Sequence, residues 1–283
     1  MRASTARRHA TARLRDAGVA SPERDADLLL AHVLDVGLGR LPLVDDLTPP
    51  QLEAYDALLA RRADREPLQH LTGTAAFRHV ELAVGPGVFV PRPETELLAG
   101  WAIEAAHAAE HGNRTCRVVD LCTGSGAIAK AVANEVADAD VHAVELDEGA
   151  LVWAERNLAG TGVDLRHGDL ATAFDDLLGT VDVVVCNPPY IPLEAWESVA
   201  TEARDHDPHL ALFSGDDGLD AIRVLEQRAA QLLRPGGVVG AEHADVQGES
   251  APGIFAAAGR WHDVADHRDL AGRPRYLTAR LAR

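Results

Sequence analysis

Four consecutive residues, Asn187, Pro188, Pro189 and Tyr190, are the part of the chain best suited to chemistry. A residue that precedes proline is pushed out of the helical region, and proline has no N–H, so this tetrapeptide is extended and poor in donors. The Asn187 amide oxygen and the Pro188 carbonyl oxygen are therefore two fixed acceptors that can bind both hydrogens of a planar NH2 group. Tyr190 adds an apolar wall beside that group. Asn-Pro can also be an ordinary turn, and only the surrounding motifs favour the functional interpretation.

An apolar run at residues 181–186 precedes the tetrapeptide and is typical of a buried parallel strand. Ligands of open α/β sheets bind beyond the carboxyl ends of such strands. A second strand pattern at 117–122 leads into a glycine-containing loop and then into a helix that begins near Ala127. Glycines let the backbone approach a ligand closely, and the helix offers free N–H groups. Cofactor contacts in this loop are expected from Asp120, Cys122, Thr123, Gly124, Ser125 and Gly126.

Two further strand ends carry acidic residues. Glu145 ends the next strand pattern, where a carboxylate can accept both hydroxyls of a ribose. Asp169 and Leu170 follow a short strand near 164–166, where they would bind the amino group and the ring of adenine, although Gly-Asp is also a common turn. Ala129 stands where a dinucleotide motif has its third glycine, which weakens NAD as the cofactor without excluding it. These positions predict a cofactor that contains a nucleoside.

The composition restricts the class of protein. Of the 283 residues, 47% are hydrophobic and 25% are charged, which is typical of a soluble globular protein, and no apolar run is long enough to span a membrane. The net charge of -17 argues against a large duplex-DNA footprint, because such surfaces are basic. The three cysteines and the scattered histidines lack metal-ligand spacing, so we expect reduced thiols, a cytoplasmic location and no metal site.

The order of the predicted elements favours an α/β protein with two unequal parts. Residues up to about 65 have helical patterns, and the apolar alternation from 77 to 90 predicts a β-hairpin with its turn at 85–87. From about residue 93, helices alternate with seven strand patterns, which indicates a mostly parallel, seven-stranded sheet with helices on both faces. We expect a helical domain at 1–66, a β-hairpin connector at 67–92 and a large domain at 93–283.

The ordered set of motifs resembles S-adenosylmethionine-dependent methyltransferases that act on NH2 groups. It is most similar to the peptide chain release factor N5-glutamine methyltransferases, and the resemblance covers nearly the whole chain. The run at 91–96 and the helical N-terminal domain separate this family from other enzymes that contain Asn-Pro-Pro-Tyr. The family-like segments are residues 67–73, 90–96, 120–129, 187–191, 207–212, 215–219 and 269–273.

The resemblance implies a Rossmann-like methyltransferase sheet with S-adenosylmethionine as the cofactor. It implies methylation of the glutamine in the Gly-Gly-Gln loop of class-one release factors, which would dock on the helical domain and the hairpin. Asn187, Pro188 and Tyr190 are the expected catalytic residues, and Asn187 would contact the cofactor as well. The expected substrate-binding residues are Arg92, Glu94, Asn187, Pro188, Pro189 and Tyr190.

Departures from the family pattern at Cys122, His243 and Pro274 leave the NH2-binding tetrapeptide intact. We expect a monomer that binds neither membranes nor, stably, nucleic acid. Trp196, just beyond the tetrapeptide, is the tryptophan best placed to line a substrate channel. Two other functions stay open: N6-adenine methylation of DNA or RNA, which uses the same motif, and nucleoside binding without catalysis.

Overall fold

The computed structural model describes residues 1–109 and 115–282 and divides the chain into two compact units. The helical unit consists of Met1–Thr74 and Ala200–His206, and the larger unit consists of Ala75–Val199 and Asp207–Arg283. Within the described ranges, no helix has the length and apolar character needed to cross a membrane. The domain limits expected at 66 and 92 stay a prediction.

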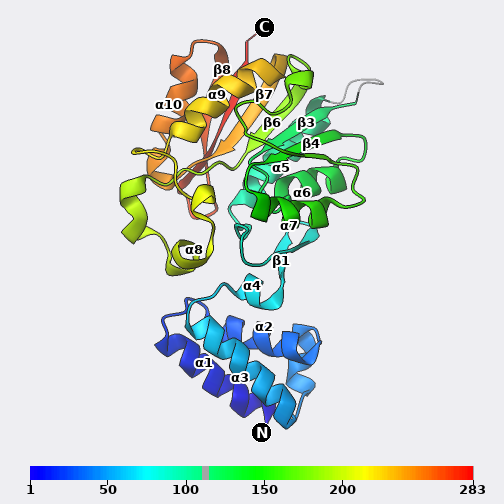
Figure 1. Ribbon diagram of the computed structural model, residues 1–283, viewed down its shortest axis with the longest axis vertical. Coiled ribbons are helices and arrows are strands. Elements are labelled where there is room, and N and C mark those ends of the chain that lie inside the picture. Colours follow the sequence, from blue (N-terminus) through cyan, green and yellow to red (C-terminus); the bar gives the residue numbers. More distant parts are fainter. Residues whose placement is uncertain (110–114, 283) are drawn as a thin grey trace. The chain divides into compact units, whose positions relative to one another are not determined.

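The helical unit confirms the helical patterns of the N-terminal residues (Figure 1). Its core contains Leu14, Leu29 and Tyr55, and the buried Tyr55 hydroxyl donates a hydrogen bond of 2.8 Å to the carbonyl oxygen of Ala26. A buried phenol needs such an acceptor, so this bond fixes α3 against α2. The elements of this unit are α1 (Ala3–Asp16), α2 (Pro22–Leu34), η1 (Leu38–Leu43), α3 (Pro49–Ala63), α4 (Leu68–Thr72) and α8 (Thr201–His206).

The short helix α8 comes from a distant part of the sequence, and ion pairs attach it to the helical unit. The Glu202 carboxylate accepts hydrogen bonds from the Arg65 guanidinium at 2.6 and 2.8 Å and from Arg62 at 3.1 Å. Arg62 is itself buried and also donates to Asp25 at 2.8 Å. Removal of one partner from this network would leave a buried charge uncompensated, so the network holds α8 on the helical unit.

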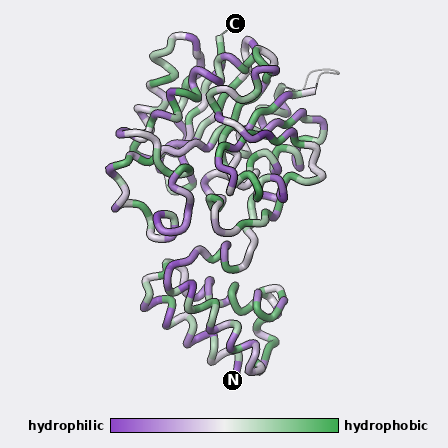
Figure 2. The backbone as a smooth tube through the Cα atoms, in the orientation of Figure 1, coloured by the Kyte–Doolittle hydropathy of each residue, from purple (hydrophilic) through white to green (hydrophobic). Residues whose placement is uncertain are grey.

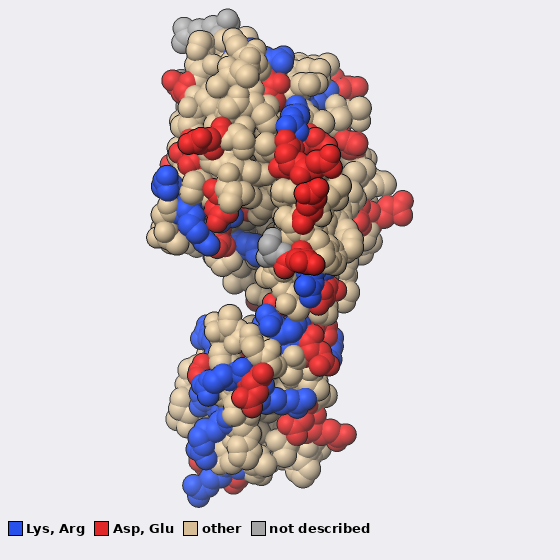
Figure 3. All heavy atoms as spheres, turned by 90° about the vertical axis from the view of Figure 1, so that its left-hand side faces the viewer, with Lys and Arg blue, Asp and Glu red and all other residues tan. Residues whose placement is uncertain are grey.

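Charge is distributed unevenly between the two units. The first 74 residues contain ten arginines and eleven acidic residues, so nearly all of the net charge of -17 lies in the rest of the chain. On the face drawn in Figure 3, basic side chains are more prominent than acidic ones on the helical unit, whereas the larger unit shows clusters of acidic side chains together with several basic ones. The acidic surface of the larger unit is unlike the basic surfaces that bind duplex DNA.

The larger unit is built on one seven-stranded sheet, which confirms the predicted fold class. Its strand order is β5-β4-β3-β6-β7-β9-β8, and the first five strands in this order are parallel. The last two pairs, β7 with β9 and β9 with β8, are antiparallel. The strands are β3 (Arg117–Leu121), β4 (Asp140–Glu145), β5 (Asp164–His167), β6 (Val181–Cys186), β7 (Leu233–Glu242), β8 (Trp261–Arg268) and β9 (Pro274–Leu281).

Helices cover both faces of this sheet (Figure 1), and hydrophobic residues follow the strands and the inner helix faces (Figure 2). Val183 and Val185 of β6 pack on the same side as α5, α6 and α7, whereas Val184 faces α9 and α10. This alternation is the period of two that a pleated strand requires. The helices are α5 (Thr95–Ala109), α6 (Ala127–Glu135), α7 (Glu148–Leu158), α9 (Asp220–Leu232) and α10 (Ser250–Ala257), with short 3-10 segments η2 (Asp175–Leu177), η3 (Leu193–Ser198), η4 (His209–Ala211) and η5 (Asp245–Gln247).

The predicted position of the hairpin turn is wrong. The two-stranded sheet pairs β1 (Thr74–Phe77) with β2 (Val80–Ala83), so the turn lies at Arg78 and His79 and not at 85–87. Arg78 adopts a φ of +50°, and two 2.7 Å hydrogen bonds hold its guanidinium on Glu135. Gly85 serves a different purpose, because a Cβ atom there would lie 2.6 Å from the Trp153 ring.

The strand β7 begins at Leu233, before the Pro-Gly-Gly sequence that would be expected to turn the chain. The Pro-Gly-Gly sequence at 235–237 is therefore contained in β7, where the register with β6 shifts between Val181 and Val183. A β-bulge of this kind accommodates residues that would otherwise end a strand. Further along β7, Gly240 is required by packing, because a Cβ atom there would lie 2.3 Å from the Trp101 ring.

Candidate functional site

The carboxyl ends of the central parallel strands bring the predicted residues to one edge of the sheet. Leu121 of β3 pairs with Val144 of β4 on one side and with Cys186 of β6 on the other. Asp120, Glu145 and Asn187 lie within one residue of these paired positions. Since all three strands run in the same direction, their side chains and loops meet where α/β sheets bind ligands.

The tetrapeptide presents two acceptor atoms without internal donors. Among the described residues, no N–H or O–H group donates a hydrogen bond to the Asn187 Oδ1 atom or to the Pro188 carbonyl oxygen. The other end of the Asn187 amide is engaged, because its Nδ2 atom donates to Thr95 Oγ1 at 3.3 Å. Asn187 is half-buried, whereas the Pro188 side chain is buried. This arrangement leaves both oxygens available for a ligand that brings two N–H groups.

Tyr190 is fixed at both its hydroxyl and its backbone. Its hydroxyl donates to Glu242 Oε1 at 3.0 Å, and its carbonyl oxygen accepts from Gln247 Nε2, also at 3.0 Å. Burial, together with the neighbouring Glu242 carboxylate, raises the pKa of Tyr190, so the phenol is neutral at physiological pH. Tyr190 is therefore a rigid wall of the site and has no acid–base role at neutral pH.

Replacement of Gly218 by alanine should displace the tetrapeptide. Gly218 has a φ of +75°, and a Cβ atom there would lie 2.3 Å from the Tyr190 carbonyl oxygen and 2.8 Å from Gln247 Nε2. Because a shift of about 1 Å at a reacting centre can cost about 10²-fold in rate, we expect Gly218→Ala to lower the rate of the reaction at this site by that order.

Gly236→Ala is the matched control for this prediction. Gly236 has a φ of +81° but no atom within 4 Å of the Cβ position, so alanine adds backbone strain of about 1–2 kcal/mol without a clash. Initial rates at saturating substrate and melting temperatures should be measured for both variants. Equal activity of the two proteins would contradict the positioning role of Gly218.

The glycine loop between β3 and α6 has an unusual backbone. Cys122, Gly124 and Gly126 have positive φ angles of 62°, 58° and 82°. Nothing lies within 4 Å of a Cβ atom at Gly124, whereas at Gly126 a Cβ atom would lie 3.0 Å from Leu158. Gly126 thus serves the packing of the loop on α7, and Gly124 leaves open space in which the backbone can contact a ligand. Thr123 and Ser125 are buried between them.

Cys122 accounts for one departure from the family pattern. Its thiol contacts that of Cys186, the residue that precedes Asn187, and burial first and this neighbour second raise the pKa of the Cys186 thiol well above its usual range. Buried, protonated thiols behave as small hydrophobic groups. The Cys122 side chain therefore fills space between the two loops.

Asp120 carries a buried acceptor that nothing in the described chain satisfies. Its Oδ2 atom accepts hydrogen bonds from Thr123 Oγ1 at 2.6 Å and from the Ala129 backbone N–H at 3.1 Å, but its Oδ1 atom is buried without a partner. Burial raises the pKa of Asp120 to about 7. An unpaired buried carboxylate oxygen is costly, and a ligand ammonium group would satisfy it. This observation fits a cofactor that carries an amino group, as S-adenosylmethionine does.

The Glu145 carboxylate is bonded to the loops on either side. Its Oε2 atom accepts from the Gly124 N–H at 2.7 Å, and its Oε1 atom accepts from the backbone N–H groups of Leu146 and Asp147 at 2.9 and 2.8 Å. Burial raises the pKa of Glu145 in spite of these bonds. A carboxylate has about four acceptor positions, so capacity for a ribose hydroxyl remains. Its role toward the cofactor stays a prediction.

Asp169 and Leu170 lie at the same edge, after β5. Asp169 is exposed, and its Oδ1 atom accepts a hydrogen bond of 2.8 Å from the Ala171 N–H. This bond is typical of a common turn in which an Asp side chain binds the backbone two residues further on. Leu170 packs partly against the hydrophobic core. The exposed Asp169 carboxylate lies after β5, as predicted, and is accessible to a ligand. Its contact with the adenine amino group stays a prediction.

Arg92 and Glu94, two expected substrate-binding residues, form ion pairs inside the larger unit. The Arg92 guanidinium lies 2.6 Å from an Asp207 carboxylate oxygen and 4.7 Å from the centre of the Phe89 ring. Burial raises the pKa of Asp207 to about 6, although Arg92 opposes this effect. Glu94 lies 3.5 Å from Arg273. Substrate contacts by these residues stay a prediction.

Trp196 belongs to an aromatic cluster after the tetrapeptide. Its ring centre lies 4.8 Å from that of His209 and 5.5 Å from that of Phe213. Phe213 forms a parallel bridge with Ile191, next to Tyr190. The cluster and the bridge therefore hold residues 209–213 beside residues 191–196, but a contact of Trp196 with substrate stays a prediction.

Three polar residues that the local sequence pattern does not indicate surround the tetrapeptide: Thr95, Glu242 and Gln247. All three are buried and hydrogen-bond to the tetrapeptide. Thr95 was visible only as part of the family-like run at 90–96. Glu242 could have been suspected, because it is a carboxylate at the end of an otherwise apolar strand pattern.

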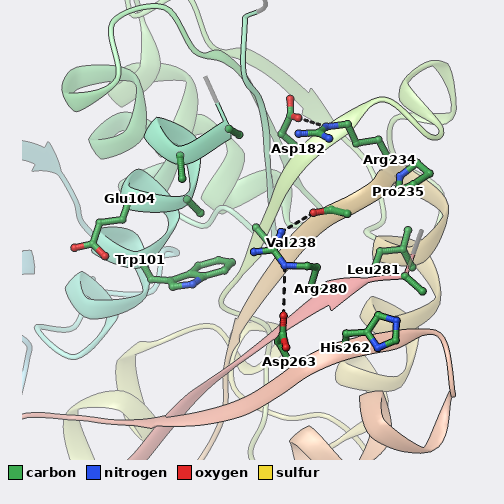
Figure 4. A pocket seen from close by; sticks show the side chains of 15 residues that line it. Trp101, Glu104, Asp182, Arg234, Pro235, Val238, His262, Asp263, Arg280 and Leu281 are labelled. Atoms are coloured by element: carbon green, nitrogen blue, oxygen red, sulfur yellow. Dashed lines mark hydrogen bonds and ion pairs between the residues drawn. The ribbon is translucent and has the colours of Figure 1, made fainter. Parts of the chain in front are cut away.

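The cavity in Figure 4 has a volume of about 1290 Å³ and lies at the opposite edge of the sheet. It is lined by Asp182 near the start of β6, by Arg234 and Val238 of β7, and by Trp101 of α5. Among the described lining residues, the two arginines are already paired, Arg234 with Asp182 and Arg280 with Asp263. Since β6 separates Asp182 from Asn187 by five residues, about 17 Å of strand, this cavity is not part of the site.

Two domain families match the chain. The PrmC N-terminal domain matches residues 5–73, and the methyltransferase small domain matches residues 94–206. The first match falls on the helical N-terminal region. The second contains the glycine loop and the tetrapeptide of the larger unit and extends through α8.

Full-length relatives are also similar to the chain. A release factor glutamine methyltransferase from Streptomyces coelicolor is 60% identical over 274 residues, which cover 96% of each chain. Another from Mycolicibacterium smegmatis is 49% identical over 286 residues and covers 100% of this chain and 99% of the relative. A 4-amino-L-phenylalanine/4-methylamino-L-phenylalanine methyltransferase from Streptomyces pristinaespiralis is 43% identical over 256 residues and covers 89% of this chain and 86% of the relative.

Proposed function

The chain belongs to the release factor glutamine methyltransferases, and on this basis we propose that it methylates the side-chain amide nitrogen of a release factor glutamine. The proposed substrate is the glutamine of the Gly-Gly-Gln loop in class-one release factors, and the methyl donor is S-adenosylmethionine. The observation that carries the proposal is the pair of acceptors at Asn187 and Pro188, which have no donor within the described chain. A primary carboxamide brings the two N–H groups that these acceptors require.

The substrate nitrogen is a weak nucleophile, because its lone pair is delocalised into the carbonyl group. Asn187 Oδ1 and the Pro188 carbonyl oxygen would accept its two N–H bonds and orient the nitrogen. As positive charge develops on nitrogen, both oxygens stabilise it, and interactions of this kind contribute about 3–4 kcal/mol each in studied enzymes. The geometry replaces a strong general base, because the proton lost from the product nitrogen can pass to water.

The cofactor would lie across the ends of β3, β4 and β5. Its sulfonium centre supplies an electrophilic methyl group. Asp120 Oδ1, which is buried without a partner, would accept from the ammonium group of the cofactor, and Glu145 would accept from its ribose. Asp169 and Leu170 would contact its base. The cofactor could approach the backbone closely at Gly124, because no atom of the described chain lies within 4 Å of the Cβ position there.

Binding of the protein substrate is assigned to the helical domain at 1–66 and to the hairpin connector. We propose a monomeric, cytoplasmic enzyme without stable nucleic-acid binding. The acidic larger unit supports the last point, because a duplex would be repelled from its surface. Arg92 and Glu94 would contribute through the segment at 91–96, next to Thr95 and the tetrapeptide.

A transfer assay with methyl-labelled S-adenosylmethionine tests this function. The purified protein is offered a class-one release factor, the same factor with Gln→Ala in the Gly-Gly-Gln loop, 4-amino-L-phenylalanine and duplex DNA in separate reactions. We expect label only on the unmodified release factor, and peptide mass spectrometry should place it on that glutamine. Label on the aromatic amine or on DNA, with none on the release factor, would overturn the proposal.

A further inference from the structure

A buried carboxylate lies directly behind the tetrapeptide. Cys186 of β6 pairs with Ala241 of β7, so the next residues, Asn187 and Glu242, are neighbours. The Glu242 side chain is 1% exposed; its Oε2 atom accepts from Thr95 Oγ1 at 2.7 Å and its Oε1 atom accepts from the Tyr190 hydroxyl at 3.0 Å. One carboxylate thus binds the last residue of the tetrapeptide directly and the first through Thr95.

The Thr95 hydroxyl determines which end of the Asn187 amide faces the ligand. A hydroxyl has a single proton, and here that proton is donated to Glu242. The Thr95 oxygen can then only accept from its other neighbour, which is the Asn187 amide at 3.3 Å. The amide must therefore turn its NH2 group inward and its Oδ1 atom toward the ligand. Amide orientations are assigned from hydrogen-bond networks of this kind.

The reverse arrangement would remove an acceptor from the site. If Thr95 donated to Asn187 Oδ1 instead, the amide would rotate and present NH2 to a substrate that also presents NH2. Two donors facing each other cannot form a hydrogen bond. An ionised Glu242 prevents this arrangement, because it accepts from both hydroxyls. Burial raises the pKa of Glu242, and the nearby Glu94 carboxylate adds to this effect; the hydrogen bonds from Thr95 and Tyr190 and the charge of Arg275 of β9 act in the opposite direction and favour the ionised carboxylate.

We propose that Thr95 and Glu242 are positioning residues that hold the Asn187 amide oxygen toward the substrate nitrogen. The proposal rests on the methyl-transfer function above and deepens it. Neither residue touches the reacting atoms in this arrangement; both act through Asn187. The run at 91–96 therefore contributes to the site, because Thr95, the first residue of α5, belongs to this run and its hydroxyl contacts the tetrapeptide.

Thr95→Val and Thr95→Ser form the decisive pair. Valine keeps the shape and removes the hydroxyl, so we expect the turnover number to fall about tenfold, the upper range for loss of one neutral hydrogen bond. Serine retains the hydroxyl and should restore the rate to within about threefold of the unmodified protein. The KM for release factor and the cofactor dissociation constant should stay nearly unchanged in both variants, at a temperature well below their melting points.

Glu242→Gln tests the direction of the network. The glutamine NH2 can donate to Thr95 and release the Thr95 proton toward Asn187, so a larger loss, about 100-fold, is expected. The Asn187 side-chain NH2 signals in a ¹⁵N–¹H NMR spectrum, identified by their absence in Asn187→Ala, should exchange slowly with water in the unmodified protein and faster in Thr95→Val. Equal rates for Thr95→Val and the unmodified enzyme would overturn the inference, and so would equal losses in the valine and serine variants. No transfer by the unmodified enzyme would instead refute the proposed function.

Discussion

Asn187→Ala should lower the turnover number for glutamine methylation by about 10³-fold, while the cofactor dissociation constant changes by no more than about threefold. The expected loss is the upper value for removal of one preorganised acceptor from a site where charge develops. It exceeds the cost of an ordinary hydrogen bond, because Asn187 Oδ1 both orients the nitrogen and stabilises its developing charge. Steady-state rates with a saturating release factor and calorimetric titration of S-adenosylmethionine measure the two quantities separately.

Asn134→Ala is the matched control, since Asn134 is an exposed asparagine in α6. It should behave as the unmodified enzyme in both measurements. A loss of cofactor affinity in Asn187→Ala as large as its loss of rate would assign Asn187 to cofactor binding and remove the acceptor role. Thermal unfolding distinguishes either result from a folding defect.

The second large effect concerns Asp120 and pH. Burial raises the pKa of this carboxyl to about 7, so it is largely protonated at pH 6 and ionised at pH 8. Because only the ionised form attracts the cofactor ammonium group, affinity for S-adenosylmethionine should fall as the pH is lowered from 8 to 6. Asp120→Asn removes the charge, and we expect about 100-fold weaker binding at pH 8 with little pH dependence.

The same substitution should stabilise the unliganded protein at pH 8. The pKa of Asp120 is higher in the folded than in the unfolded state, so the folded state binds more protons between these values, and stability falls as the pH rises from about 4 to about 7. At pH 8 the full cost, at most about 4 kcal/mol, is present, and asparagine avoids it. Asp138→Asn, at an exposed carboxylate, controls for the change in net charge. An unchanged or lower melting temperature in Asp120→Asn would contradict this account of the buried charge.

Local sequence patterns were sufficient to predict most of the strands and helices of the larger unit. The buried strands at 117–121 and 181–186 are apolar runs that end in polar loops, and such runs are visible without any knowledge of their neighbours. The hairpin turn was misplaced because the glycines and proline at 85–87 outweighed Arg78 in a local interpretation. Arg78 is held at positive φ by Glu135, a residue 57 positions away, and no local pattern contains that contact.

The sequence by itself determined the chemistry of the tetrapeptide, because proline restricts the backbone of its neighbours and removes donors wherever the chain folds. Tertiary structure alone decided how Asn187 is oriented. The Thr95 and Glu242 side chains that set its amide are 147 residues apart in sequence. The pairing of β7 with β6 places Glu242 beside Asn187, and the packing of α5 on these two strands brings Thr95 to both. Hydrogen bonds between distant side chains depend on strand order and register, and the hydrophobic periodicity of the sequence predicts neither of these. The acceptors are thus a property of the sequence, and the direction in which one of them points is a property of the fold.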